Sequence, residues 1–285
     1  MSEPPRSRDA RRLAETALVR IVDAYGAVPE FVLLGGLVPD LLCSRSSTLH
    51  VGTTDVDVQV NLEIAGGSVN ASRLEAALHT AGFAPDHQRV WRWQDHSAPG
   101  LVVKAEFLAD LDDVPNQATV NFDGCDQLGA VNLRGTGFAT RDWQLRPLTA
   151  PGPNGAVNVE LRVAGLAGYL LAKTHAAYRR RATKDWYDLA YVLIHNDAGG
   201  PRRAATAVID RFAADITGET RTALDDLASN FAGPDAQAPQ AYAETMLDLH
   251  PEHDWDLLTN DAVTAVEEFM AGLAGEPRSR PVSDE

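Results

Sequence analysis

Two aspartates stand two positions apart in the stretch TTDVDVQVNL, which spans residues 53 to 62. Polar and apolar residues alternate here, so the stretch predicts a β-strand with Asp55 and Asp57 on one face and valines buried on the other. Two carboxylates held this close repel each other unless a cation binds them. Hard divalent cations such as Mg²⁺ take oxygen ligands and also bind substrate phosphates. The pair therefore predicts a metal site, and the alternative is an edge strand with solvated aspartates.

A glycine pair lies upstream of these aspartates. Residues 31–34 form an apolar run that predicts a buried strand, and Gly35 and Gly36 close it in a turn before a short helical segment. Backbone N–H groups of such a turn can approach an anion, and a helix that begins after it offers its positive end. We therefore expect Gly35 and Gly36 to bind phosphate groups. Arg45, in the polar loop that follows, is either a triphosphate ligand or a solvated surface residue.

A further carboxylate lies in the middle of a later predicted strand. Residues 89–94 and 101–108 predict successive strands, and the second places Glu106 at a central position with apolar neighbours. A carboxylate is rarely placed in such a position without a partner. The alternative to a functional role is a glutamate held by a salt bridge or carried on an edge strand. The acidic run after this strand is expected to be solvated, at Asp110, Asp112 and Asp113.

The segment KTHAAYRRRATKDWYDLA covers residues 173–190. Its pattern predicts one helix over residues 164–181 and a second over residues 184–195, with Thr183 as the N-cap of the second. The helical domain is expected to continue in four more helices, over residues 202–215, 219–231, 240–249 and 254–274.

Charged residues gather where the first two of these helices meet. Asp185 lies in the first turn of the second helix, where the helix dipole favours a negative charge, and Asp188 lies one turn further on the same face. A surface ion pair between the two helices is the simple explanation for Lys173 and Asp185. A basic cluster beside them either guides a phosphate backbone or is a solvated helix end, and consists of Arg179, Arg180, Arg181 and Lys184.

The order of these features is more specific than any one of them. G-G, then D-x-D, then a mid-strand glutamate, then a lysine followed by K-D-x-x-D-L resembles the nucleotidyltransferase fold shared with DNA polymerase beta. Within that fold, the segment from residue 173 onward is similar to AbiEii-type nucleotidyltransferase toxins of bacterial type IV toxin–antitoxin systems. The resemblance covers residues 32 to 193. Two features depart from it: the commoner Gly-Ser of the fold is Gly-Gly here, and the gap from Gly36 to Asp55 is longer than in the shortest versions.

The resemblance implies a set of roles. One or two Mg²⁺ or Mn²⁺ ions are expected to be held by Asp55, Asp57 and Glu106. Lys173 is expected to contact the nucleotide phosphates. Catalysis is expected to involve an aspartate of the following helix, Asp185 by preference and Asp188 as second choice.

The activity that the resemblance implies is transfer of an NMP from an NTP to an acceptor hydroxyl, with release of pyrophosphate. RNA is the expected acceptor, with a tRNA 3′ end as the first candidate, and a separately encoded antitoxin protein is the expected partner. A small-molecule nucleotidyltransferase of the aminoglycoside- or lincosamide-modifying kind is one alternative. A catalytically inactive nucleotide-binding or interaction module is another.

Composition sets wider bounds on the protein. The 285 residues carry a formal net charge of −15, which argues against nonspecific coating of nucleic acid but allows a local basic groove or a cationic small substrate. Two cysteines are too few for a disulfide framework. The first twelve residues lack the apolar core of a signal peptide, and no apolar run reaches membrane-spanning length. We therefore expect a cytoplasmic protein without membrane contacts.

The pattern of elements predicts the α+β class. A mixed nucleotidyltransferase-like sheet with flanking helices is expected over residues 1–161, a helical domain over residues 162–275 and a disordered tail over residues 276–285. The loop between the last two helices contains HPEHD, in which His250 and His253 suggest a metal pair. A nearby third ligand is not expected from the sequence, so we interpret this segment as a turn.

Overall fold

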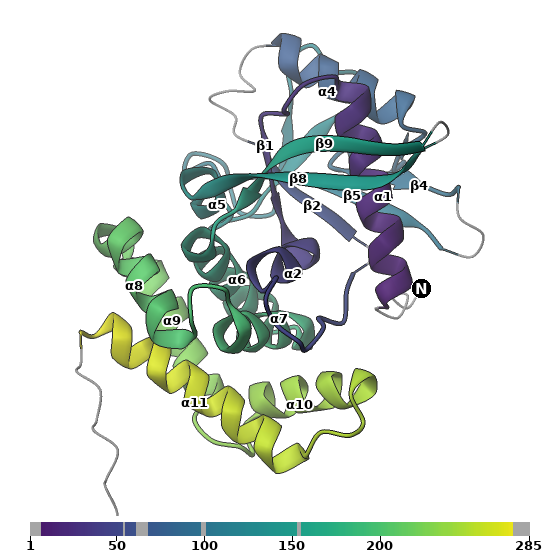
Figure 1. The fold of residues 1–285 in the computed structure, drawn as a ribbon. Helices are drawn as coiled ribbons and strands as arrows, with labels where there is room; N and C mark the ends of the chain where they lie inside the picture. Colours follow the sequence, from purple (N-terminus) through teal and green to yellow (C-terminus); the bar gives the residue numbers. More distant parts are fainter. Residues whose placement is uncertain (1–6, 54, 61–67, 98–100, 153–154, 276–285) are drawn as a thin grey trace, which may run out of the picture. The chain divides into compact units, whose positions relative to one another are not determined.

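The computed structural model of the chain describes residues 7–53, 55–60, 68–97, 101–152 and 155–275. It divides into two units, of which the first contains residues 1–42 and 49–176 and the second contains residues 43–48 and 177–285. The predicted α+β class is confirmed, and all described strands belong to the first unit (Figure 1). The boundary expected near Arg162 lies inside a strand, and the division falls after Ala176 instead.

A mixed sheet forms the centre of the first unit. Its strands lie side by side in the order β3 (Ala84–Pro85), β4 (Arg92–Asp95), β5 (Val103–Ala109), β2 (Asp55–Val60), β1 (Phe31–Leu34), β9 (Gly155–Ala164) and β8 (Trp143–Gly152). A side branch is formed by β7 (Gly129–Asn132), which pairs with β5, and by β6 (Thr119–Asn121), which pairs with β7. The β2–β5 and β1–β9 pairs are parallel, whereas β1–β2 and β4–β5 are antiparallel.

The alternation predicted from the sequence is present in β5 and in the two described side chains of β2. The side chain of Asp55 is 16% exposed, whereas the neighbouring Val56 is 1% exposed. In β5 the apolar positions are buried, and Lys104 and Glu106 between them are half-buried. All four residues of β1 are buried, as a continuous apolar run predicts for a central strand. Around Asp55, Lys104 and Glu106 the sheet therefore has a charged face, and the opposite face of β5 is apolar.

Two helices cover the apolar face. Helix α1 (Arg8–Tyr25) contacts β2, β5, β8 and β9, and α4 (Ser68–Thr80) lies along α1 (Figure 1). The Ser7 side chain accepts a hydrogen bond from the N–H of Ala10 and caps α1 at its start, and Gly26 ends it at φ 73°. Arg20 of α1 forms an ion pair with Asp95 of β4, a residue on the same face as the buried Val103.

Two expectations for the first unit are wrong. The Pro- and Gly-rich composition of residues 142–158 predicts a loop that ends in a short strand over residues 157–161, yet most of this segment forms the β8–β9 hairpin. Proline removes a hydrogen-bond donor from a sheet, but β8 lies at the edge, where Pro147 and Pro151 are tolerated. The sequence TGFAT, at residues 136–140 between glycine turns, predicts a short strand, but its last three residues begin the short helix α5 (Phe138–Arg141).

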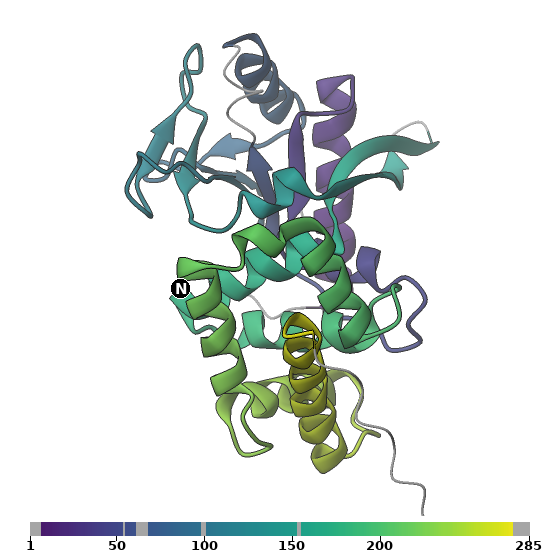
Figure 2. The same cartoon turned by 90° about the vertical axis from the view of Figure 1, so that its left-hand side faces the viewer.

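The C-terminal part of the chain is helical, as predicted. Helix α6 (Leu166–Arg180) begins in the first unit and ends in the second. It is followed by α7 (Thr183–His195), α8 (Pro201–Phe212), the 3₁₀ turn η2 (Ala213–Asp215), α9 (Gly218–Asn230), α10 (Gln237–Leu249) and α11 (Trp255–Leu273). Helix α11 contacts α7, α8, α9 and α10, which gather around it (Figure 2). Thr183 was expected to cap α7, but it is the first helical residue and Ala182 takes the N-cap position.

Within the described ranges, no helix is both long enough and apolar enough to cross a membrane. The tail predicted over residues 276–285 lies outside the described residues.

Candidate active site

The strand register brings the predicted acidic positions together on the charged face of the sheet. In the parallel β2–β5 pair, Asp57 is the register partner of Glu106 and Asp55 is the register partner of Lys104. Because register partners in neighbouring strands share a face, the pairing brings the three acidic positions to one place on the sheet. The side chain of Asp57 lies outside the described part of the chain, and its backbone position is what the register fixes.

Basic neighbours compensate the charges of the two described carboxylates. Lys104 Nζ lies 3.7 Å from Asp55 Oδ1. Arg92, the partner of Glu106 on the antiparallel side, donates from Nε to Glu106 Oε1 at 2.6 Å and also forms an ion pair with it. Side chains of Arg92 and Glu106 are about one fifth exposed, at 21% and 22%. The charged face therefore alternates acid and base, an arrangement that lowers the repulsion between the carboxylates without a bound cation.

The glycine turn lies at the start of β2, beside the carboxylates. Leu34, the last residue of β1, is the register partner of Asp57, and the 3₁₀ turn η1 (Gly35–Leu37) follows it directly. Gly35 has a φ of 79°, which favours glycine. A Cβ at Gly36 would lie 2.7 Å from the Cβ of Thr53, so the absent side chain leaves room for Thr53.

Thr53 connects the turn with the first carboxylate. Its Oγ1 accepts a hydrogen bond from the N–H of Asp55 at 3.1 Å. Gly36 therefore has a structural reason to be glycine as well as the predicted phosphate-binding one. The helix that follows, α2 (Val38–Leu42), has only five residues. Because so short a helix carries a small dipole, the expected contribution of its positive end to anion binding is weak.

Arg45 belongs to the second unit, whereas the glycine turn belongs to the first. Its side chain is exposed, and its backbone N–H donates to Asp197 Oδ1 at 2.9 Å. Ser44 donates to Asp197 Oδ2 from its backbone N–H and from its hydroxyl, at 3.1 Å and 2.7 Å. Burial on its own would raise the pKa of Asp197, but these hydrogen bonds and the charge of Arg45 lower it overall. The described contacts of this segment thus hold a loop in place.

Lys173 is buried within α6, with 6% of the residue exposed. The start of that helix is fixed by Asp142, whose backbone carbonyl accepts from the N–H of Gly165 at 2.7 Å and whose carboxylate accepts from the N–H of Gly168 at 2.8 Å. Further along, the ring of His175 occupies the space beside Gly135, where a Cβ would lie 2.4 Å from His175 Cγ. These contacts set the position of Lys173 within the first unit.

Asp185 and Asp188 belong to the second unit, and both are completely buried. Arg180 binds the Asp185 carboxylate with two hydrogen bonds, from Nη2 to Oδ1 at 2.8 Å and from Nε to Oδ2 at 3.1 Å. This bidentate contact crosses from the end of α6 to the first turn of α7, where the helix dipole also favours a negative charge. Asp185 is therefore no solvated surface residue, and its contact with Arg180 was not predicted.

The other arginines of the basic cluster are paired as well. Arg179 forms an ion pair with Glu219, and Arg181 forms one with Asp226 at 2.6 Å. Most of the positive charge that the sequence places at this helix end is thus compensated by acidic side chains of the second unit. These ion pairs favour the interpretation of the arginines as a paired helix end over their interpretation as a groove for a phosphate backbone.

The environment of Asp110 differs from the one expected from the sequence. It was expected to be solvated, yet its Oδ2 accepts from the N–H of Gly135 at 2.8 Å and from the N–H of Gly137 at 2.9 Å. Asp110 therefore organises the turn that leads into α5. The sequence signal is the closely spaced Gly135 and Gly137, since short polar side chains often accept from such exposed backbone donors.

The donor set of the charged face suits a hard divalent cation. Asp55, Asp57 and Glu106 offer only carboxylate oxygens, the ligand type that Mg²⁺ and Mn²⁺ prefer. Such an ion would compete with Lys104 and Arg92 for these oxygens.

No protein-family model, no curated protein and no solved structure matches the chain.

Proposed function

We propose that the chain is a Mg²⁺- or Mn²⁺-dependent nucleotidyltransferase that moves an NMP from an NTP to an acceptor hydroxyl. The observation that carries the proposal is the register of β2 and β5, which pairs Asp57 with Glu106 beside the glycine turn. The metal would polarise the α-phosphate and stabilise the leaving pyrophosphate. Asp55, Asp57 and Glu106 would hold it, while Gly35 and Gly36 would contact the outer phosphates.

Charge compensation on this face fits an enzyme that gains its cation together with the nucleotide. Lys104 and Arg92 lie beside the carboxylates and would be released when a metal takes their place. A released guanidinium is a good ligand for a triphosphate, because it donates two parallel hydrogen bonds to phosphate oxygens. Lys173 would neutralise further phosphate charge.

The acceptor that the resemblance favours is RNA, with a tRNA 3′ end as the first candidate, in a cytoplasmic toxin whose antitoxin is a separate protein. One observation favours a second candidate. Arg179, Arg180 and Arg181 are each paired with an acidic side chain, and the chain carries a net charge of −15. A cationic small molecule, such as an aminoglycoside, suits such a surface better than a polyanion does.

The test is incubation of the purified chain with each α-labelled NTP and Mg²⁺, once with total RNA and once with a panel of amino-hydroxyl compounds. Label in RNA supports the toxin-like enzyme, and label in a small compound supports the second candidate. Asp57→Ala serves as the inactive control. If neither RNA nor a small compound becomes labelled and the chain binds no NTP, the result favours a non-catalytic module. The paired carboxylates would then stabilise the sheet.

A further inference from the structure

The turn between α10 and α11 brings together the two histidines and the glutamate of HPEHD. His250 is the C-cap of α10, and its N–H donates to the carbonyl of Met246 at 2.8 Å. His253 donates from its N–H to the carbonyl of His250 at 3.1 Å, which closes the turn. Asp254 then caps α11 by accepting from the N–H of Leu257 at 2.9 Å. The backbone of the turn is therefore fixed by both helices.

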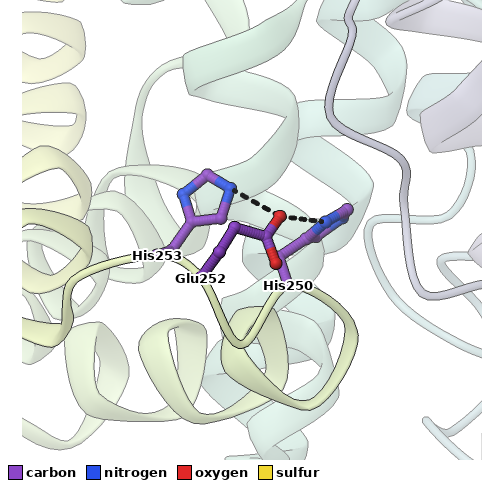
Figure 3. A group of neighbouring side chains, drawn as sticks. All are labelled: His250, Glu252 and His253. Atoms are coloured by element: carbon purple, nitrogen blue, oxygen red, sulfur yellow. Dashed lines mark ion pairs between the residues drawn. The ribbon is translucent and has the colours of Figure 1, made fainter.

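The three side chains of this turn converge. Figure 3 shows the carboxylate of Glu252 between the two imidazole rings, with His250 on one side and His253 on the other. Glu252 Oε1 lies 3.5 Å from His250 Nδ1 and 3.9 Å from His253 Nε2. The three possible ligand atoms all lie within 4.8 Å of one another. The expectation that His250 and His253 have no third ligand nearby is wrong, because the turn brings Glu252 between them.

The geometry is close to what a tetrahedral ion requires. With metal–ligand bonds of about 2.0–2.2 Å, neighbouring ligand atoms of a tetrahedral zinc site are about 3.3–3.5 Å apart. The two distances from Glu252 are at or slightly above this value, and the separation of the two imidazole nitrogens is at most 4.8 Å, so side-chain rotations would complete the site. Glu252 is 70% exposed and His253 is 34% exposed, so both side chains have room to rotate and an ion can reach them.

The chemistry of the donors selects the class of ion. Two imidazole nitrogens and one carboxylate oxygen suit borderline cations such as Zn²⁺, Ni²⁺ and Cu²⁺, whereas Mg²⁺ prefers oxygen ligands only. Three protein ligands leave one position of a tetrahedron open for water or a substrate atom, as in catalytic rather than structural zinc sites.

A third imidazole lies in the same neighbourhood, at the end of α7. His195 stacks on Tyr191, with ring centroids 4.8 Å apart. Its Nε2 is buried and has no hydrogen-bond partner among the described residues. Burial first, and then the charges of His253 and His250, lower the pKa of His195 to about 4. The ring is thus neutral near pH 7.

We propose that His250, Glu252 and His253 form a binding site for one borderline divalent cation, with Zn²⁺ as the first candidate and one coordination position open. The site lies wholly within the second unit and does not depend on the nucleotidyltransferase activity proposed above.

The test is a calorimetric titration of the full chain with Zn²⁺, after bound metal has been removed with a chelator. We expect one equivalent per chain, at least a tenfold loss of affinity in His253→Ala, and a similar loss in Glu252→Gln. His87→Ala is the matched control, since it removes an exposed histidine far along the sequence in the first unit. Asp57→Ala is the second control. Zinc bound at the carboxylates of the sheet would be lost in this variant, whereas zinc bound at the turn would be retained.

A spectroscopic measurement separates a built site from a loose surface contact. Co²⁺ in a four- or five-coordinate site absorbs strongly in the visible range, whereas hydrated six-coordinate Co²⁺ absorbs weakly. We expect the strong bands in the wild type and in His87→Ala, and their loss in His253→Ala. The Tm without metal serves as the check on folding, and it should be the same in Glu252→Gln and in the wild type. Equal zinc affinity in His253→Ala and His87→Ala, or only weak Co²⁺ absorption, would overturn the proposal.

Discussion

Asp57 and Glu106 are register partners in the parallel pair of β2 and β5, although the chain builds α4, β3 and β4 between them. Two acids that serve one metal ion act as a unit, because removing either one opens the same coordination sphere. Their substitutions are then strongly non-additive, as is usual for groups that act together. If each acid only stabilises the sheet through its own ion pair, the effects of the two substitutions add.

Asp57→Ala and Glu106→Gln should each lower the rate of NMP transfer at least about 100-fold, because metal-assisted stabilisation of the transition state contributes several kcal/mol. The double variant should be no slower than the slower single one. Initial rates with labelled NTP measure this. Asp112→Asn is the control, since Asp112 is fully exposed and pairs only with Arg134 in the described contacts. Full transfer activity in Asp57→Ala would remove the metal assignment.

Arg92→Gln should strengthen binding of Mg²⁺ by about 3- to 10-fold, because the guanidinium that competes for Glu106 is gone, and a gain of this size corresponds to about 1 kcal/mol. Calorimetric titration with Mg²⁺ alone, without nucleotide, measures it, because the triphosphate would lose a ligand in this variant. Arg12→Gln, which removes the exposed partner of Asp9, should leave the affinity unchanged. Weaker Mg²⁺ binding in Arg92→Gln would mean that the arginine positions the glutamate rather than competing with the ion.

Gly36→Ala should destabilise the first unit by about 1–3 kcal/mol, because the new methyl group would overlap the side chain of Thr53. Urea unfolding measures the change. Gly233→Ala is the matched control, since a Cβ there meets no described atom within 4 Å and its free energy of unfolding should change by less than about 0.5 kcal/mol. Equal stability of the two variants would show that Thr53 has room to move.

Asp95→Asn should lower the free energy of unfolding at pH 7 by about 2 kcal/mol, as expected when a buried charge-assisted contact is lost. Burial alone would raise the pKa of Asp95, but hydrogen bonds from Ser97 and the contact with Arg20 lower it overall. A carboxyl with a lowered pKa in the folded state stabilises above its unfolded pKa, and this contribution is lost as the pH falls through the folded pKa.

The difference between the wild type and Asp95→Asn should therefore be constant near neutral pH and shrink below about pH 4, the ordinary range of an aspartate pKa. Unfolding curves at several pH values measure it. A difference that grows as the pH falls would contradict the lowered pKa.

Local sequence patterns predicted several features of the strands correctly. The alternation in β2 fixed which side of the strand Asp55 takes, and the apolar run before Gly35 gave a buried central strand, because both depend only on neighbours in sequence. The mid-strand position of Glu106 followed in the same way.

What could not be predicted depends on register and on tertiary contacts. The contact between Arg92 and Glu106 requires the alignment of β4 with β5, which no local pattern determines. The β8–β9 hairpin was missed because proline signals a break, and only the place of β8 at the sheet edge makes proline acceptable. Glu252 was overlooked as a ligand because its orientation depends on how the turn between α10 and α11 closes.

The prolines of the sheet have a consequence for association between molecules. The main path of the sheet ends at β8, which contains Pro147 and Pro151, and at β3, which has two residues and contains Pro85. Neither rim offers an unbroken row of amide donors, so neither can easily recruit a strand from another chain. Strand addition from another molecule is therefore disfavoured at both ends of this path.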